Sequence, residues 1–167
     1  MIKLEHTVLA SPEQMEFIIE GMRNPTNSWE KSDSRVCNYI FKGYCDACEK
    51  QGNCATYREE TDFYLGGMDE ELMQKLSNAG TDHRKFMRMM PVYVRITAPL
   101  YWWEEFDTYK VGTVANSCSN NQTRNVMMNY EVLANIYKSR KNHKLDEWQE
   151  FCKWIEELPY SELILSA

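Results

Sequence analysis

The sequence lacks a surplus of basic residues, and this argues against one broad class of function. It has 19 lysines and arginines against 25 aspartates and glutamates, which gives a net charge of −6. Affinity for the phosphates of nucleic acids generally needs a basic surface. We therefore expect no generic nucleic-acid binding. The one basic cluster, residues 138–144, lies near the predicted end of a helix, where cations complement the helix dipole.

The sequence also lacks an apolar run long enough to cross a membrane, which takes about 20 residues. Its first residues include Glu5 and His6 and do not resemble a secretory signal. Internal repeats and low-complexity tracts are missing as well. These features predict a cytoplasmic protein whose thiols are mostly reduced.

The composition does provide the material for a packed core. Hydrophobic residues make up 43% and aromatic residues 13% of the 167 residues, which excludes a disordered chain. A chain of this length can form one domain of ordinary size. We predict a single domain over residues 1–167, with a cysteine-rich insertion at about residues 35–56.

The pattern of start and stop signals predicts a helix-rich α+β fold with an antiparallel sheet and long carboxy-terminal helices. Ser11-Pro12-Glu13-Gln14 can form a capping box, and the helix that it starts should end at Asn24-Pro25. The alternation of Val92, Val94 and Ile96 with polar residues predicts a half-buried strand. Further helices are predicted over residues 69–79, 82–89, from 99 onward, 122–141 and 145–158.

The predicted helix over residues 122–141 has an arginine in its apolar stripe. At 100° per residue the stripe comprises Val126, Tyr130, Leu133, Ile136 and Tyr137. Asn129 and Arg140 fall within it, about 16 Å apart along the helix axis. An arginine that faces the core needs an anionic partner. The partner is either a ligand phosphate or carboxylate or, more commonly, an internal Glu or Asp.

Four cysteines lie close together in the first half of the chain, at Cys37, Cys45, Cys48 and Cys54. Four thiolates satisfy tetrahedral zinc, and two cysteines separated by two residues can bind a metal from a single turn. The spacing therefore predicts a structural zinc site. An iron–sulfur cluster would use the same ligands, and unpaired thiols or two disulfides are the remaining alternatives. Cys152, on an apolar helix face, is predicted to lie in the core.

Acidic and aromatic residues are mixed in the stretch after Pro99. Trp102 and Trp103 have the helical spacing that usually indicates core or a subunit interface. Glu104, Glu105 and Asp107 could form a pair of acid/base carboxylates, but such a run is more typical of a solvated helix face.

Several segments follow one another in an order that is typical of one enzyme family. His83 precedes Ala98-Pro99 across the predicted strand, and the aromatic stretch of residues 100–106 follows. Residues 113–119 come next and match a Ser-x-Asn-Glu-x-Ser turn if one residue is inserted. Asn129, Asn135 and Arg140 then have the spacing of two asparagines and an arginine on a long helix. In these segments, and in the opening strand and helix of residues 7–23, the sequence resembles the flavin-dependent thymidylate synthases.

The resemblance implies a pyrimidine-nucleotide enzyme with FAD. Family members make thymidylate from dUMP, with methylenetetrahydrofolate as carbon donor and reduced FAD as hydride source, so a folate and a nicotinamide reductant are implied partners. They are homotetramers, with each active site at the junction of several subunits. By resemblance, the flavin would contact His83, Tyr109, Lys110, Asn129 and Asn135. The nucleotide would contact Asn116, Ser119 and the catalytic residue Arg140.

The sequence departs from the family pattern in four places. Thr108-Tyr109-Lys110 replaces an Arg-His-Arg triplet, Ser117 replaces a glutamate, and Glu131 stands where an arginine is usual. Only residues 120–128 separate Ser119 from Asn129, where the family has a long segment. These departures favour a second hypothesis, a nucleotide-binding or zinc-stapled interaction protein without turnover. Another modification of a pyrimidine nucleotide is a third.

Overall fold

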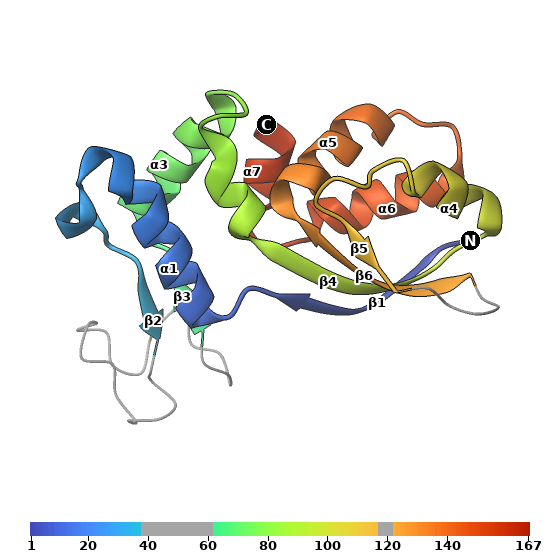
Figure 1. The fold of residues 1–167 in the computed structure, drawn as a ribbon, viewed down its shortest axis with the longest axis horizontal. Helices are drawn as coiled ribbons and strands as arrows, with labels where there is room; N and C mark the ends of the chain where they lie inside the picture. Colours follow the sequence, from blue (N-terminus) through green and yellow to red (C-terminus); the bar gives the residue numbers. More distant parts are fainter. Residues whose placement is uncertain (38–61, 117–121) are drawn as a thin grey trace. The chain divides into compact units, whose positions relative to one another are not determined.

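The computed structural model describes residues 1–37, 62–116 and 122–167 (Figure 1). Two compact units can be distinguished. The sheet unit comprises Met1–Leu9 and Gln74–Ala167, and the small unit comprises Ala10–Met73. No helix among the described residues is both long and apolar enough to span a membrane.

The sheet unit is built on four antiparallel strands in the order β1-β4-β6-β5. The central strands β4 (Pro91–Thr97) and β6 (Thr123–Asn129) pair in a register that sets Val94 opposite Val126. β1 (Lys3–Leu9) forms one edge and the short β5 (Val114–Ala115) the other. The predicted antiparallel sheet is therefore confirmed.

The two faces of the sheet differ as the predicted alternation requires. Val92, Val94 and Ile96 are buried, whereas Tyr93 and Arg95 between them are exposed. The helices α4 (Leu100–Phe106), α5 (Tyr130–Arg140), α6 (Asp146–Glu156) and α7 (Ser161–Ser166) all lie on one side of the sheet (Figure 1). The buried side chains of β4 point to that side, because apolar side chains are stable only where helices exclude water.

An aromatic cluster fills the space between α4 and α6. Trp102, Trp103 and Phe106 come from α4, and Trp148 and Phe151 come from α6; each is at most 1% exposed. The rings of Trp102 and Phe106 are stacked at a centroid distance of 4.9 Å. The core role predicted for Trp102-Trp103 and for the apolar face of the last long helix is confirmed, and Cys152 is buried as well.

The predicted helix over residues 122–141 is wrong in its first third. Residues Thr123–Asn129 form strand β6: Val126 and Met128 are buried and alternate with less buried neighbours, and the strand pairs with β4 along its whole length. The helix begins only at Tyr130, where Asn129 caps it: the side-chain Oδ1 accepts a hydrogen bond from the backbone N of Val132 at 3.0 Å. Asn129 and Arg140 therefore lie at opposite ends of α5, the first as its N-cap and the second as its last residue.

The small unit begins with the predicted capping box. The side chain of Ser11 accepts from the backbone N of Gln14, and the side chain of Gln14 accepts from the backbone N of Ser11. Helix α1 (Pro12–Arg23) stops at its C-cap Asn24, as predicted, and the 3₁₀ turns η1 (Asn24–Thr26) and η2 (Trp29–Lys31) follow. Strands β2 (Arg35–Cys37) and β3 (Asp62–Tyr64) form a two-stranded antiparallel sheet.

Helix α3 (Gly67–Asn78) agrees with the prediction for residues 69–79 to within two residues. The segment after it is different from the prediction. Residues Arg84–Met89 form a 3₁₀ helix, η3, and not an α-helix over residues 82–89. Gly80 separates the two elements with φ of +102°, a conformation that glycine adopts without steric cost.

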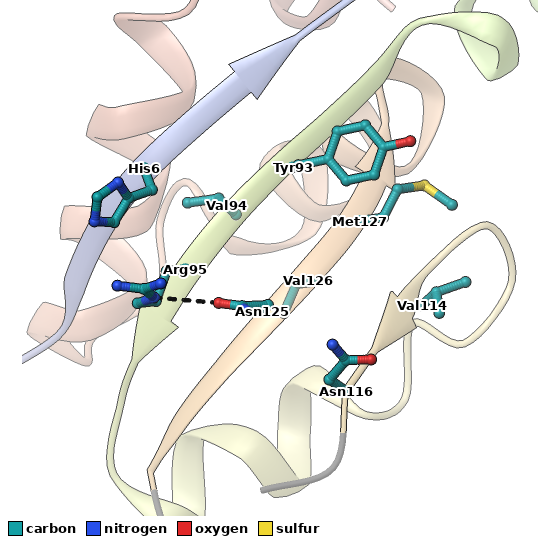
Figure 2. Close-up of a pocket in the computed structure, with 9 residues that line it drawn as sticks. All are labelled: His6, Tyr93, Val94, Arg95, Val114, Asn116, Asn125, Val126 and Met127. Carbon is teal, nitrogen blue, oxygen red and sulfur yellow. Dashed lines mark hydrogen bonds between the residues drawn. The ribbon is translucent and has the colours of Figure 1, made fainter.

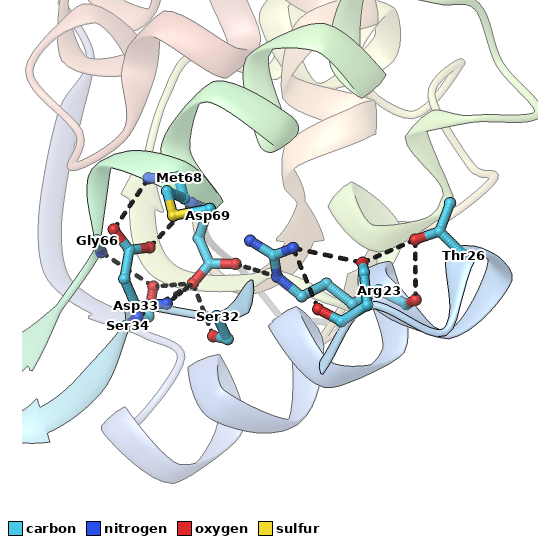
Figure 3. A network of polar contacts seen from close by, with 9 residues as sticks. Arg23, Thr26, Ser32, Asp33, Ser34, Gly66, Met68 and Asp69 are labelled. Atoms are coloured by element: carbon cyan, nitrogen blue, oxygen red, sulfur yellow. Dashed lines mark hydrogen bonds and ion pairs between the residues drawn. The ribbon is translucent and has the colours of Figure 1, made fainter. Parts of the chain in front are cut away.

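A buried carboxylate organises the small unit. Asp69, in the first turn of α3, is fully buried and accepts hydrogen bonds from Arg23 Nε at 2.6 Å and from the hydroxyls of Ser32 and Ser34 at 2.7 Å each (Figure 3). The backbone N atoms of Asp33 and Ser34 donate to it at 3.1 Å. Burial raises the pKa of Asp69, but the hydrogen bonds from Ser34, Ser32 and Arg23 outweigh it and hold the pKa below the ordinary value.

Asp33 completes this network by capping α3. Its carboxylate oxygens accept from the backbone N of Met68 at 3.0 Å and of Asp69 at 3.2 Å (Figure 3). Gly66 permits the close approach, since a Cβ atom at that position would lie 2.1 Å from Cγ of Asp33. The first turn of α3 is thus joined to the loop before β2 in both directions: its backbone N–H groups donate to Asp33, and its Asp69 accepts from the backbone of that loop.

Candidate functional site

The exposed face of the four-stranded sheet contains a cavity of about 400 Å³, which we call the sheet pocket (Figure 2). All four strands or their ends contribute to it. It is lined by His6, Tyr93, Val94, Arg95, Val114, Asn116, Asn125, Val126 and Met127. The volume falls within the range of about 300–1,000 Å³ that is typical of small-molecule sites.

The polar groups of the sheet pocket include a cation without an ionic partner. Arg95 Nε donates to Oδ1 of Asn125, its cross-strand neighbour, at 3.2 Å. Glu5 lies opposite Arg95 in the register of β1 and β4, yet no ion pair joins Arg95 to any described residue. Tyr93 presents a ring that is 48% exposed. A guanidinium, an aromatic ring and side-chain amides are together suited to an anionic, planar ligand.

Backbone strain marks the β1 side of this pocket. His6 has φ of +53°, in the left-handed region, at the bulge where the register of β1 against β4 shifts. For a residue other than glycine the left-handed conformation costs about 1–3 kcal/mol, and residues with such strained backbones cluster at functional sites. The bulge allows the imidazole of His6 to line the pocket.

One nucleotide-binding residue predicted from sequence lies in the sheet pocket. Asn116 follows β5, and its backbone N donates to the carbonyl oxygen of Asn125 at 3.0 Å, which extends the pairing of β5 with β6. Its predicted companion Ser119 lies outside the described residues. Tyr93, Arg95 and Asn125 were missed by the sequence reasoning. The outward position of Tyr93 and Arg95 follows from the alternation, whereas Asn125 was assigned to a helix.

Arg140 forms a second constellation, the Arg140 cluster, with Glu105, Tyr109 and Trp148. Its Nη1 lies 3.0 Å from Oε2 of Glu105, and its Nε donates to the hydroxyl of Tyr109 at 3.0 Å. The guanidinium also lies over the ring of Trp148, 4.7 Å from the centroid. The charge partner of Arg140 is therefore an internal glutamate, the commoner of the two alternatives considered from the sequence.

Glu105 is a further residue that the sequence reasoning missed. The acidic run was interpreted as a solvated helix face, and the side chains of Glu105 and Asp107 are indeed 38% and 45% exposed, but each is also paired with an arginine. Glu105 binds Arg140 and accepts from the indole N–H of Trp148 at 2.8 Å, while Asp107 pairs with Arg124 at 2.9 Å. The signal was available, because Glu105 lies three residues after Trp102 and hence beside the apolar stripe of α4.

The five residues predicted to contact flavin lie outside the sheet pocket. His83, Lys110 and Asn135 are exposed and open to solvent. Tyr109 binds Arg140, and Asn129 caps α5, with the backbone of Gly112 packed against its amide. Their role toward a flavin stays a prediction.

Glu131, which stands where the family usually has an arginine, forms an ion pair within the chain. Glu131 pairs with Arg88 of η3 through both carboxylate oxygens. It is thus not a free negative charge, and it contributes to holding η3 against α5.

The predicted zinc ligands Cys45, Cys48 and Cys54 lie outside the described residues, as does the side chain of Cys37. Among the residues that the structure does describe, no group of three His, Cys, Asp or Glu side chains could hold a metal ion. The zinc site stays a prediction.

Comparison with known proteins was informative only at the level of structure. No family model and no curated protein matches the sequence. Two crystal structures of the flavin-dependent thymidylate synthase ThyX from Helicobacter pylori, each with FAD and dUMP, are similar to this chain. The first has a TM-score of 0.59 and 13% identity over 98% of this chain and 96% of the other. The second has a TM-score of 0.61 and 12% identity over 99% and 96%. The α+β fold of this chain is therefore that of the flavin-dependent thymidylate synthases, as the sequence resemblance predicted.

Proposed function

We propose that this protein binds a uridine nucleotide such as dUMP together with FAD, on the scaffold of a divergent flavin-dependent thymidylate synthase. The observation that carries the proposal is the sheet pocket, where Asn116, which was predicted from sequence, lies beside Arg95 and Tyr93. The two similar structures contain FAD and dUMP, and this supports the same ligands here.

The residues of the sheet pocket suit the parts of a nucleotide. Arg95 has no ionic partner among the described residues, so its remaining N–H groups can donate to phosphate oxygens. The ring of Tyr93 can stack on a pyrimidine. Asn116 and Asn125 offer amides for the sugar hydroxyl and the ring carbonyls.

The flavin site is proposed to require a second copy of the chain. His83, Lys110 and Asn135 are exposed, so their side chains are accessible to another subunit that closes the cradle. This supports the homotetramer implied by the family resemblance. When bound and reduced, for instance by a nicotinamide, FAD would supply a hydride for the methylation of dUMP with methylenetetrahydrofolate. The chain's own residues bind and orient the ligands.

The first experiment measures flavin and nucleotide binding. Protein incubated with FAD and then gel-filtered should keep the flavin absorbance, and calorimetry should detect dUMP binding. Arg95→Ala should weaken dUMP binding about tenfold or more, because a charge-assisted hydrogen bond is lost. The matched control Lys138→Ala, at an exposed position on α5, should bind as the parent does. Failure of the parent to keep flavin and to bind dUMP would show the proposal to be wrong.

Binding without turnover is the second candidate, and the Arg140 cluster favours it. In this chain Arg140 is already bound by Glu105 and by Tyr109, the residue that replaces the family's histidine. Tyr109 offers a phenol where the family has an imidazole. An assay for dTMP formation with FAD, methylenetetrahydrofolate and a nicotinamide reductant separates the two candidates. Binding of dUMP with no dTMP formed would select the non-catalytic role.

A structural zinc site is proposed separately for the cysteine-rich insertion. The proposal rests on the spacing of Cys37, Cys45, Cys48 and Cys54 alone. Metal analysis of the purified parent should give one zinc per chain, and Cys45→Ser should lower that content. An unchanged zinc content in the variant would exclude the site.

A further inference from the structure

Strand β1 contains a bulge that places His6 on the exposed face of the sheet. The register of β1 against β4 shifts between Glu5 and Val8. His6 and Thr7 therefore stand together opposite the single residue Val94. In a regular strand the side chains alternate, and His6 would point to the helix-covered side, as the buried Val94 does.

Thr7 takes the inward position instead. Its hydroxyl accepts a hydrogen bond from the indole N–H of Trp154, on helix α6, at 3.3 Å. His6 adopts φ of +53°, and its side chain lines the sheet pocket together with Arg95. Figure 2 shows the imidazole at the same end of the pocket as Arg95, away from Tyr93. The bulge thus adds to the pocket one side chain that a regular strand would turn away.

The imidazole of His6 takes no part in holding the bulge. It makes no hydrogen bond, ion pair or ring contact with any residue that the structure describes. A left-handed conformation persists only where the surrounding structure enforces it. The contact of Thr7 with α6 and the strand pairs on both sides of the bulge supply that enforcement. Both ring nitrogens are therefore available to a ligand in the pocket.

The charges around His6 favour an anion. Strand β4 contributes the guanidinium of Arg95 and the phenol of Tyr93 to the lining. On β1 itself, Lys3 and Glu5 share the exposed face, and neither lines the pocket. Strands β5 and β6 contribute asparagine amides and apolar side chains, while α6 approaches β1 from the other side. Lys3 offsets Glu5, so Arg95 and a protonated imidazole leave the pocket positive.

A phosphate monoester offers more acceptors than Arg95 can use. It has three terminal oxygens, and a guanidinium binds two of them through parallel N–H groups. Nε of Arg95 already donates to Asn125, so only the terminal amino groups remain for the phosphate. An imidazole N–H from the neighbouring strand can donate to the third oxygen.

We infer that His6 is the second phosphate-binding residue of the sheet pocket and strengthens its preference for a nucleoside monophosphate over the unphosphorylated nucleoside. The inference rests on the proposed function, in which this pocket binds a uridine nucleotide. It adds a contact from β1 to the contact of Arg95, and with it a pH dependence of binding that a guanidinium does not give.

The test compares dUMP with deoxyuridine, which lacks the phosphate. Calorimetry at about pH 6.5 measures both Kd values for FAD-treated protein, because an imidazole ordinarily titrates near this pH. In His6→Asn the Kd of dUMP should rise about three- to tenfold, since a charge-assisted hydrogen bond is lost. The Kd of deoxyuridine should stay that of the parent. Asparagine adopts the left-handed conformation more readily than most residues, so this variant keeps the bulge.

Lys3→Gln is the matched control. It removes a positive charge from the same strand and the same face, but Lys3 does not line the pocket, so both Kd values should equal those of the parent. If His6→Asn does not fold, as judged by circular dichroism, the result for His6→Gly decides, because glycine adopts positive φ without steric cost.

A pH series separates a charged imidazole from a residue that only shapes the strand. The cationic fraction of an imidazole falls as the pH rises above about 6.5. The ratio of the dUMP Kd in His6→Asn to that in the parent should therefore decrease to less than about twofold at about pH 8.5. The ratio cancels the second ionisation of the phosphate, near pH 6, because both proteins meet the same ligand.

The remaining outcomes overturn the inference in distinguishable ways. Equal weakening of dUMP and deoxyuridine in His6→Asn would place His6 at the ring or the sugar and not at the phosphate. An unchanged Kd of dUMP would remove His6 from the site, and a ratio that does not vary with pH would exclude the charged imidazole. In all three cases the parent still binds dUMP, so the proposed function stands. A parent that does not bind dUMP would end both.

Discussion

Arg23 in the small unit and Arg140 in the sheet unit are each paired with one carboxylate, but in very different surroundings. Arg23 lies 2.6 Å from Asp69, and the two side chains are 4% and 0% exposed. Arg140 lies 3.0 Å from Glu105, and these side chains are 21% and 38% exposed. The free energy of a buried ion pair depends on complete satisfaction of both charges, whereas solvent compensates for gaps at a half-exposed pair.

This contrast is one of accessibility to solvent. Asp69 accepts five hydrogen bonds, one of them from Arg23 Nε (Figure 3). Nη1 of Arg23 also donates to Ser28. Nη2 of both arginines has no hydrogen-bond partner among the described residues, so the two differ in their exposure and not in the number of their contacts. Arg140 is therefore the more accessible of the two to solvent.

The largest effect is expected when the buried pair is broken. Asp69→Ala leaves the guanidinium of Arg23 buried without its carboxylate and should lower the free energy of unfolding by about 3–5 kcal/mol. Urea titration followed by circular dichroism measures this. The control Glu71→Ala, at an exposed position on the same helix, should change it by less than about 0.5 kcal/mol. A loss of less than about 1 kcal/mol in Asp69→Ala would remove the distinction between the two arginines.

A pH titration should show a smaller effect of the same carboxylate. The pKa of folded Asp69 is held below its ordinary value of 3.8, so the unfolded chain binds the proton more readily. Its stabilising contribution is therefore present above about pH 4 and is lost as the pH falls through the lower, folded pKa. Thermal unfolding between neutral pH and pH 3 should show a steeper loss of stability for the parent than for Asp69→Asn. Equal slopes would contradict the assigned pKa shift.

The next largest effect on stability is expected at Gly66, whose backbone lies close to Asp33. A Cβ atom there would lie 2.1 Å from Cγ of Asp33 and 2.5 Å from its carbonyl carbon, so Gly66→Ala must displace the cap of α3. We expect a loss of about 1–3 kcal/mol in the free energy of unfolding. Gly67→Ala is an almost ideal control, because nothing lies within 4 Å of a Cβ atom at that neighbouring position. If both variants lost the same free energy of unfolding, contact between Gly66 and Asp33 would not explain the loss.

The sequence predicted those parts of the fold that depend on local chemistry. The capping box at Ser11 and the alternation of Val92, Val94 and Ile96 each act over a few residues, and both were confirmed. Strand β6 was mistaken for a helix because the spacing of Val126, Tyr130 and Leu133 also fits a helix. Pairing with β4 decides between the two structures, and that contact is formed with residues more than twenty positions away.

The candidate site shows the same limit. Asn116 could be named only through the family resemblance, and it does lie in the sheet pocket. Glu105 and Asp69 could not be named as partners of Arg140 and Arg23, since they are 35 and 46 positions away in the chain. An ion pair between distant segments leaves no local pattern, so a sequence can indicate that a core-facing arginine needs an anion without identifying it.

The smallest effect on stability is expected at the Arg140 cluster, and it is the sharpest test of the comparison. Arg140→Gln and Glu105→Gln should each lower the free energy of unfolding by about 1 kcal/mol or less, with Lys138→Gln as the neutral control. The double variant then gives a coupling energy between the two side chains, which we expect at about 0.2–1 kcal/mol, the range of half-exposed pairs.

A coupling above about 2 kcal/mol would mean that Glu105 holds Arg140 as firmly as Asp69 holds Arg23, and the argument from exposure would fail. A coupling in the expected range has a functional consequence. A ligand carbonyl or a second subunit could then compete for Arg140 with the energy of a single hydrogen bond. The weakness of the pair would be the property that leaves this arginine able to respond to a ligand, while the small unit stays fixed by the stronger one.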